Sequence, residues 1–97
     1  MLYKQVAEEV FFDILSGKYK PGEQLPSVRK LADFYQVNVN TVQRSISELK
    51  MSGLVIKRKM CNYVVQESEI IEDVKTNYIK KIENDYFRVK ERIGIKW

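Results

Sequence analysis

Residues 38–44 gather side chains that can hydrogen-bond to nucleic-acid bases and phosphates: Asn38, Asn40, Thr41, Gln43 and Arg44. Asn and Gln carry a donor beside an acceptor, which matches an adenine edge, whereas Arg favours guanine and Thr contacts a phosphate or a thymine methyl. Apolar residues recur through the same segment at intervals of four and three: Val42, Ile46 and Leu49. This spacing predicts a helix with one face on a core and its front end toward a partner. The alternative is an ordinary surface helix whose polar first turn serves capping.

Reactive chemistry has few candidate residues. The chain has no histidine and one cysteine, Cys61. An intramolecular disulfide, a His/Cys metal cluster and nucleophiles activated by histidine are therefore excluded within one chain. Carboxylate chemistry stays open. We interpret the pairs Glu8–Glu9 and Glu72–Asp73 as solvated helix faces, and we expect neither an enzyme nor a bound metal or cofactor.

The length and charge of the chain indicate how many domains it can form and how they differ. A chain of 97 residues accommodates one modest domain and an appendage. Because no long apolar run is present and acidic residues occupy the start, we expect no membrane span or signal peptide and a cytoplasmic protein. Residues 1–66 hold ten basic and six acidic side chains, whereas residues 67–97 hold seven of each. This predicts a basic domain over 1–66, with a polyanion as partner, and a neutral element over 67–97.

Three helices are predicted in the first part of the chain. The first covers about residues 2–16, carries the core-facing residues Tyr3, Val6, Val10 and Ile14 at intervals of three and four, and ends at Gly17. The second opens at Ser27 as N-cap, and the third is capped by Asn38 and ends before Gly53. The Pro-Gly connector between the first two helices is expected to be ordered. Since only about three residues separate the second and third helices, we expect a helix-turn-helix.

The pattern then changes from helix to strand and back. The runs "LVIKRK" and "YVVQ" predict a hairpin, with Met60, Cys61 and Asn62 in its turn. Cys61 is interpreted as a turn residue, with a redox switch as the alternative. After Gln66 a helical stripe follows, made of Ile71, Val74, Tyr78, Ile82, Tyr86, Val89 and Ile93. The predicted fold is mainly α with a small β-hairpin, a winged helix-turn-helix domain followed by a C-terminal dimerisation helix.

The segment "GKYKPGEQLPSVRKLADFYQVNVNTVQRSISELKMSGLV" resembles the DNA-binding domain of GntR-type bacterial transcription regulators. The forms "V-N-x-N-T-V" and "Y-x-Q-V" are similar to the YtrA subfamily, and the resemblance covers about residues 3–65. It implies that Arg29 contacts DNA, with Ser27 and its helix end near a phosphate. It also implies that the polar residues at 38–44 form the front of a recognition helix. Candidate DNA contacts in the hairpin are Lys57, Arg58, Lys59 and Asn62.

This chain departs from the family pattern at three places. Val39 stands where relatives carry Arg or Pro, and Gln43 stands where many carry a basic residue. The hairpin tip has the residues "KMCN" at 59–62 in place of a "G-x-G" form, which predicts a bulkier tip. Strand alternation is expected to send Lys57 and Lys59 to one face and Arg58 to the other. The alternative role for these bases is protection of an edge strand.

The predicted last helix is expected to pair with a second copy, because its apolar stripe is too long for one small domain to cover. Folding back onto the same chain is the alternative. Together with the resemblance, pairing implies a homodimeric repressor on a pseudo-palindromic operator, of its own operon or a transporter operon. The competing hypothesis is a winged-helix module that binds proteins and not DNA. No effector pocket is recognisable in the sequence.

Overall fold

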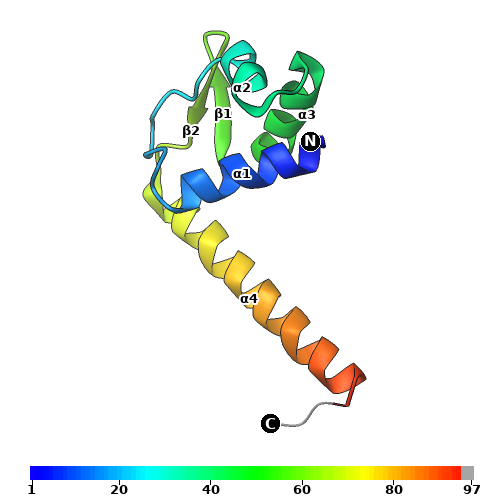
Figure 1. Ribbon diagram of the computed structural model, residues 1–97. Helices are drawn as coiled ribbons and strands as arrows, with labels where there is room; N and C mark the ends of the chain where they lie inside the picture. Colours follow the sequence, from blue (N-terminus) through cyan, green and yellow to red (C-terminus); the bar gives the residue numbers. More distant parts are fainter. Residues whose placement is uncertain (95–97) are drawn as a thin grey trace.

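The computed structural model describes residues 1–94, which form four helices and one two-stranded sheet. In chain order the elements are α1 (Tyr3–Leu15), α2 (Val28–Tyr35), α3 (Val39–Met51), β1 (Val55–Arg58), β2 (Cys61–Val64) and α4 (Ser68–Arg92). Figure 1 shows α1, α2, α3 and the hairpin gathered into one unit, from which α4 leaves as a long helix. The predicted fold class, three helices and a hairpin followed by a last long helix, is confirmed.

The hydrophobic core lies between α1, α3 and the hairpin. α1 buries Val6, Val10 and Ile14 at the predicted spacing. α3 buries its predicted apolar positions on the face opposite its polar side chains. Further buried apolar side chains come from the connector, α2, the hairpin and the start of α4: Leu25, Leu31, Ala32, Leu54, Val55, Val64, Val65 and Ile71. One face of α3 is therefore fixed on the core while the other stays in solvent.

Local capping fixes the helix-turn-helix. Ser27 Oγ accepts a hydrogen bond from the Lys30 amide at 3.2 Å, so α2 begins where predicted. α2 ends at Tyr35 and is followed by the C-cap residue Gln36, which adopts the left-handed conformation with φ of 58°. Asn38 then caps α3, and Gly53, with φ of 85°, follows the helix end. The short turn at Gln36 places α3 directly after α2.

The hairpin is tighter than predicted. β1 pairs antiparallel with β2, and Arg58 lies opposite Cys61. The turn consists of Lys59 and Met60 alone, with φ of 50° and 68°. Positive φ at both central residues is the type I′ geometry, which usually selects Asn-Gly because a left-handed L-residue costs roughly 1–2 kcal/mol. The tip is therefore both bulky and strained.

Two sequence interpretations of the hairpin were wrong. Cys61 and Asn62 were expected in the turn, but they are the first two residues of β2, because the turn uses two residues only. Lys59 was expected to share a strand face with Lys57, but β1 ends at Arg58 and Lys59 belongs to the turn, where strand alternation no longer applies.

A third segment borders β2: the Leu25 amide donates to the Asn62 carbonyl at 2.8 Å, and Gln24 bridges to Tyr63.

The start of α4 packs on α1. The Tyr78 ring lies 5.1 Å from the Phe11 ring and 5.9 Å from the Phe12 ring, measured between centroids. Ile71 is buried and Val74 packs against the core. These three positions of the predicted dimerisation stripe, Ile71, Val74 and Tyr78, thus contact their own domain. The alternative of folding back therefore holds for the first half of the stripe, because α1 offers an aromatic surface there.

No helix among residues 1–94 combines the length and the apolar character that crossing a membrane requires.

Candidate nucleic-acid interface

The outer face of α3 carries exposed polar side chains. Asn40, Gln43 and Arg44 are all exposed, and Ser47 continues the same face one turn later. Neither the Asn40 nor the Gln43 side-chain amide makes a hydrogen bond with another described residue. Sequence reasoning missed Ser47, although its helical spacing from Asn40 and Arg44 places it on this face. This face offers donors and acceptors that its own domain leaves unused.

Asn38 and Thr41 are hydrogen-bonded to each other at the start of α3. Asn38 Oδ1 accepts from the Thr41 amide at 2.8 Å and from Thr41 Oγ1 at 3.0 Å. Because this oxygen already serves the helix cap, the Asn38 amide cannot present donor and acceptor together to an adenine. Its Nδ2 group remains as a donor. The Asn38 side chain therefore primarily orders the front of α3.

Arg44 is held by α1. Its guanidinium carbon lies 3.9 Å from the centroid of the Tyr3 ring. The buried Ser45 strengthens this junction, since its Oγ lies 2.7 Å from the Tyr3 carbonyl oxygen and 2.9 Å from that of Thr41. Tyr3 had been predicted only as a core residue. A signal was present in the sequence, because Ser45 is a polar residue among the apolar positions of the buried α3 face.

The first turn of α2 carries a second set of candidate contacts. Ser27 Oγ is occupied by capping, and Arg29 is exposed in the first helical turn. A helix N-terminus favours anions through its free amides and dipole. Arg29 thus places a guanidinium next to a weak anion-attracting helix end.

The hairpin carries the basic side chains. Lys57, Arg58 and Lys59 are exposed, and the Arg58 guanidinium carbon lies 4.5 Å from the Tyr63 ring centroid. Asn62, predicted at the tip, lies in β2 opposite Lys57. Its Oδ1 is buried and has no hydrogen-bond partner among the described residues. The strand register therefore turns the Asn62 oxygen away from a partner at the tip.

Three elements bring these residues to one end of the molecule. Figure 1 shows the hairpin turn, α2 and the beginning of α3 at the end that lies opposite α4. The charged groups here are cationic except for Asp33, which follows on α2. A basic hairpin beside an exposed helix front is suited to a duplex, in which phosphates flank readable base edges.

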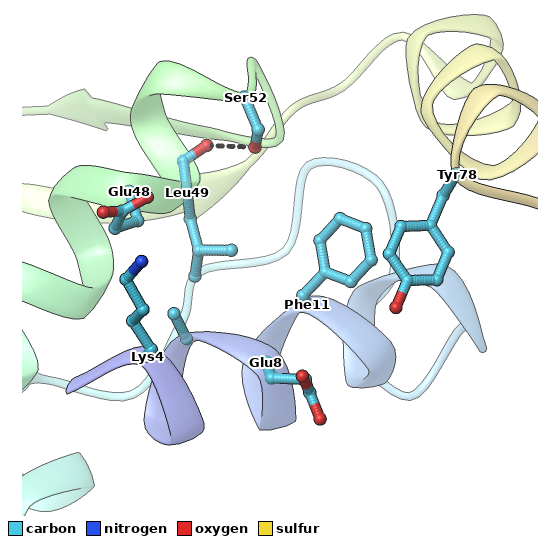
Figure 2. Close-up of a pocket in the computed structure, with 8 residues that line it drawn as sticks. Lys4, Glu8, Phe11, Glu48, Leu49, Ser52 and Tyr78 are labelled. Carbon is cyan, nitrogen blue, oxygen red and sulfur yellow. Dashed lines mark hydrogen bonds between the residues drawn. The ribbon is translucent and has the colours of Figure 1, made fainter. Parts of the chain in front are cut away.

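Two pockets elsewhere in the structure do not bring together a comparable set of polar and basic side chains. One of about 360 Å³ lies between α1, α3 and α4 and is lined by Lys4, Ala7, Glu8, Phe11, Glu48, Leu49, Ser52 and Tyr78. Figure 2 shows that the Glu8 and Glu48 carboxylates come from different helices and point away from each other. In the other hollow, burial raises the pKa of Tyr35 to about 12. A pair of acids acting together, as carboxylate catalysis requires, is not formed in the first hollow.

Comparison with known proteins gives a consistent result. The family model described as bacterial regulatory proteins, gntR family, matches residues 2–65. The transcriptional regulator YhcF of Bacillus subtilis is 28% identical over 95 residues, which cover 97% of this chain and 78% of that protein. The transcriptional repressor YtrA of the same organism is 39% identical over 54 residues, covering 56% of this chain and 42% of that protein.

The solved structures agree with the sequence match. A GntR family transcriptional regulator from Listeria monocytogenes superposes with a TM-score of 0.88 at 28% identity. The superposition covers 97% of this chain and 83% of that chain, so the similarity includes the long last helix as well as the helix-turn-helix.

Proposed function

The chain belongs to the gntR family of bacterial regulatory proteins and is a DNA-binding transcriptional regulator of that family, and we propose that it acts as a repressor that occupies a pseudo-palindromic operator as a homodimer. The observation that carries the proposal is the exposed polar face of α3 beside the cationic hairpin. The name of the related YtrA protein, a repressor, supports the direction of control. Bound at a promoter, such a dimer excludes the transcription machinery.

The contacts divide between base reading and positioning. We assign base reading to Asn40, Gln43 and Arg44, because these side chains project from the outer face of α3. Phosphate contacts fall to Ser27 with the first turn of α2, to Arg29, and to the hairpin bases Lys57, Arg58 and Lys59. Asn38 and Thr41 support α3 through the cap. Asn62 is left out of the interface, because its oxygen is buried.

The exposed half of α4 supports the homodimer. Five apolar side chains with half or more of their surface exposed follow each other at intervals of three and four: Ile79, Ile82, Tyr86, Val89 and Ile93. This repeat of seven is the seam of a left-handed coiled coil. Burying each side chain fully in a partner stabilises by roughly 1.5–3 kcal/mol. A second α4 provides such a partner by symmetry.

These assignments divide the chain into residues 1–66 for DNA binding and residues 67–97 for dimerisation. The start of the second part needs one adjustment. Ile71, Val74 and Tyr78 belong to the packing of the first unit. We therefore propose that the dimer interface begins at Ile79. The regulated genes are proposed to be the chain's own operon or a neighbouring transporter operon, as the family resemblance implies.

Selection of bound duplexes from a random oligonucleotide pool tests the proposal. Repeated inverted half-sites among the selected fragments, and an affinity that falls steeply with rising salt, are the expected results. Substituting Arg29→Ala or Gln43→Ala lowers affinity for the selected duplex while the circular dichroism spectrum stays unchanged. No enrichment of any fragment, or binding to protein partners that is insensitive to salt, would favour the protein-interaction module.

A further inference from the structure

The hairpin tip presents an apolar side chain that the described part of the chain leaves largely uncovered. Met60 is 85% exposed and lies in the two-residue turn between β1 and β2. Its φ of 68° and the φ of 50° at Lys59 both lie in the left-handed region, where glycine or asparagine is normally selected. With so little of its surface covered, Met60 gains almost no packing energy to offset this conformation. Strain held without local compensation is typical of functional sites.

The surroundings of Met60 are cationic. Lys59 precedes it, Lys57 and Arg58 end the strand before it, and the Arg58 guanidinium is held over the Tyr63 ring. Figure 1 places this turn at the same end as α2 and the beginning of α3. An exposed apolar group that directly follows three cationic residues in the hairpin matches a surface in which apolar walls lie between phosphates. The grooves of a DNA duplex have this character.

We infer that Met60 is an apolar wedge that enters the minor groove next to the bases read by α3, with Lys59 on the flanking phosphate. This inference rests on the proposed DNA-binding function. Methionine is unbranched and polarisable, so it adapts to the gap between two base pairs. Methionine is among the apolar residues that partially unstack a base step and bend the duplex toward the major groove.

Insertion of Met60 predicts a sequence preference in the operator. Pyrimidine–purine steps such as TA and CA unstack most easily, so the position beneath each hairpin is expected to carry such a step. This preference acts without any hydrogen bond to a base edge. It adds specificity outside the segment that Asn40, Gln43 and Arg44 reach.

Three variants of the full chain distinguish the contribution of the Met60 side chain to DNA binding from that of the turn conformation and the Lys59 charge. Met60→Gly removes the apolar group and relieves the left-handed φ, Lys59→Gly relieves the neighbouring φ and removes a charge, and Met60→Leu keeps an apolar group of similar size. Each is measured for thermal unfolding without DNA. Affinity and its salt dependence are measured on the selected duplex, and bending is measured by energy transfer between dyes at the duplex ends.

Met60→Gly is expected to raise the melting temperature, weaken binding about tenfold, reduce bending and leave the salt slope unchanged. Lys59→Gly is expected to raise the melting temperature as well, but to lower the salt slope by about one and retain the bend. Met60→Leu retains affinity and bend. Wild-type affinity and bending in Met60→Gly would overturn the wedge while leaving the proposed function intact. A wild-type protein that binds no duplex would overturn both.

Discussion

The Arg44 guanidinium of α3 lies over the Tyr3 ring of α1, with 3.9 Å between the guanidinium carbon and the ring centroid. This contact restrains a long side chain that would otherwise sample many rotamers. Preorganisation of this kind lowers the entropy lost when the side chain binds a base or phosphate.

Tyr3→Leu is predicted to weaken operator binding about two- to fivefold, which corresponds to the roughly 0.5–1 kcal/mol of an exposed cation–π contact. Tyr3→Phe is the matched control, because it keeps the ring and is expected to retain affinity. Fluorescence anisotropy with a labelled duplex measures both. In an Arg44→Ala background the Tyr3→Leu change should have no further effect on affinity. Full additivity of the two changes would contradict the proposed coupling.

Asn38→Ala is predicted to lower the free energy of unfolding by about 1 kcal/mol, since the Thr41 amide loses its cap acceptor. Asn38→Ser restores an acceptor without restoring the amide group. We expect this variant to recover most of the stability and most of the DNA affinity. Urea unfolding and anisotropy provide the two readouts. Recovered stability with affinity still lost would instead assign Asn38 a direct contact with DNA.

Ile82→Glu combined with Tyr86→Glu is predicted to convert the dimer to monomers, because the two charges enter the seam of α4. Both side chains are at least half exposed in the single chain, so the monomer itself should remain folded. Lys81→Glu, on the same helix but outside the seam, serves as the control. Sedimentation velocity distinguishes the species. A dimer that persists in the double variant would show that another surface carries the association.

Asn62→Leu is predicted to leave DNA binding unchanged and to raise the free energy of unfolding by about 1 kcal/mol. Asn62 Oδ1 is buried without a hydrogen-bond partner among residues 1–94, and such a group carries its full desolvation penalty. A leucine of similar shape removes that penalty. Thermal unfolding and anisotropy measure the two quantities. Reduced affinity with unchanged stability would restore Asn62 to the DNA interface.

The sequence was sufficient for features set by local physics. Ser27 and Asn38 were identified as caps because Ser and Asn side chains satisfy free amides at a helix start. The apolar spacing of α1 and α3 identified the buried faces, because a helix has a fixed period. The exposed front of α3 follows from the same period. These features depend on neighbours within a few residues, which the sequence displays directly.

Tertiary structure decided the features that depend on which surfaces meet. The apolar stripe of α4 reads as continuous in the sequence, but the rings of Phe11 and Phe12 take up Tyr78, so the exposed seam starts one residue later at Ile79. The hairpin register buries the Asn62 oxygen and leaves Met60 at the tip. The stacking of Arg44 on Tyr3 joins residues 41 positions apart. Local periodicity tells which residues share a face of an element, whereas the packing of elements decides what that face contacts.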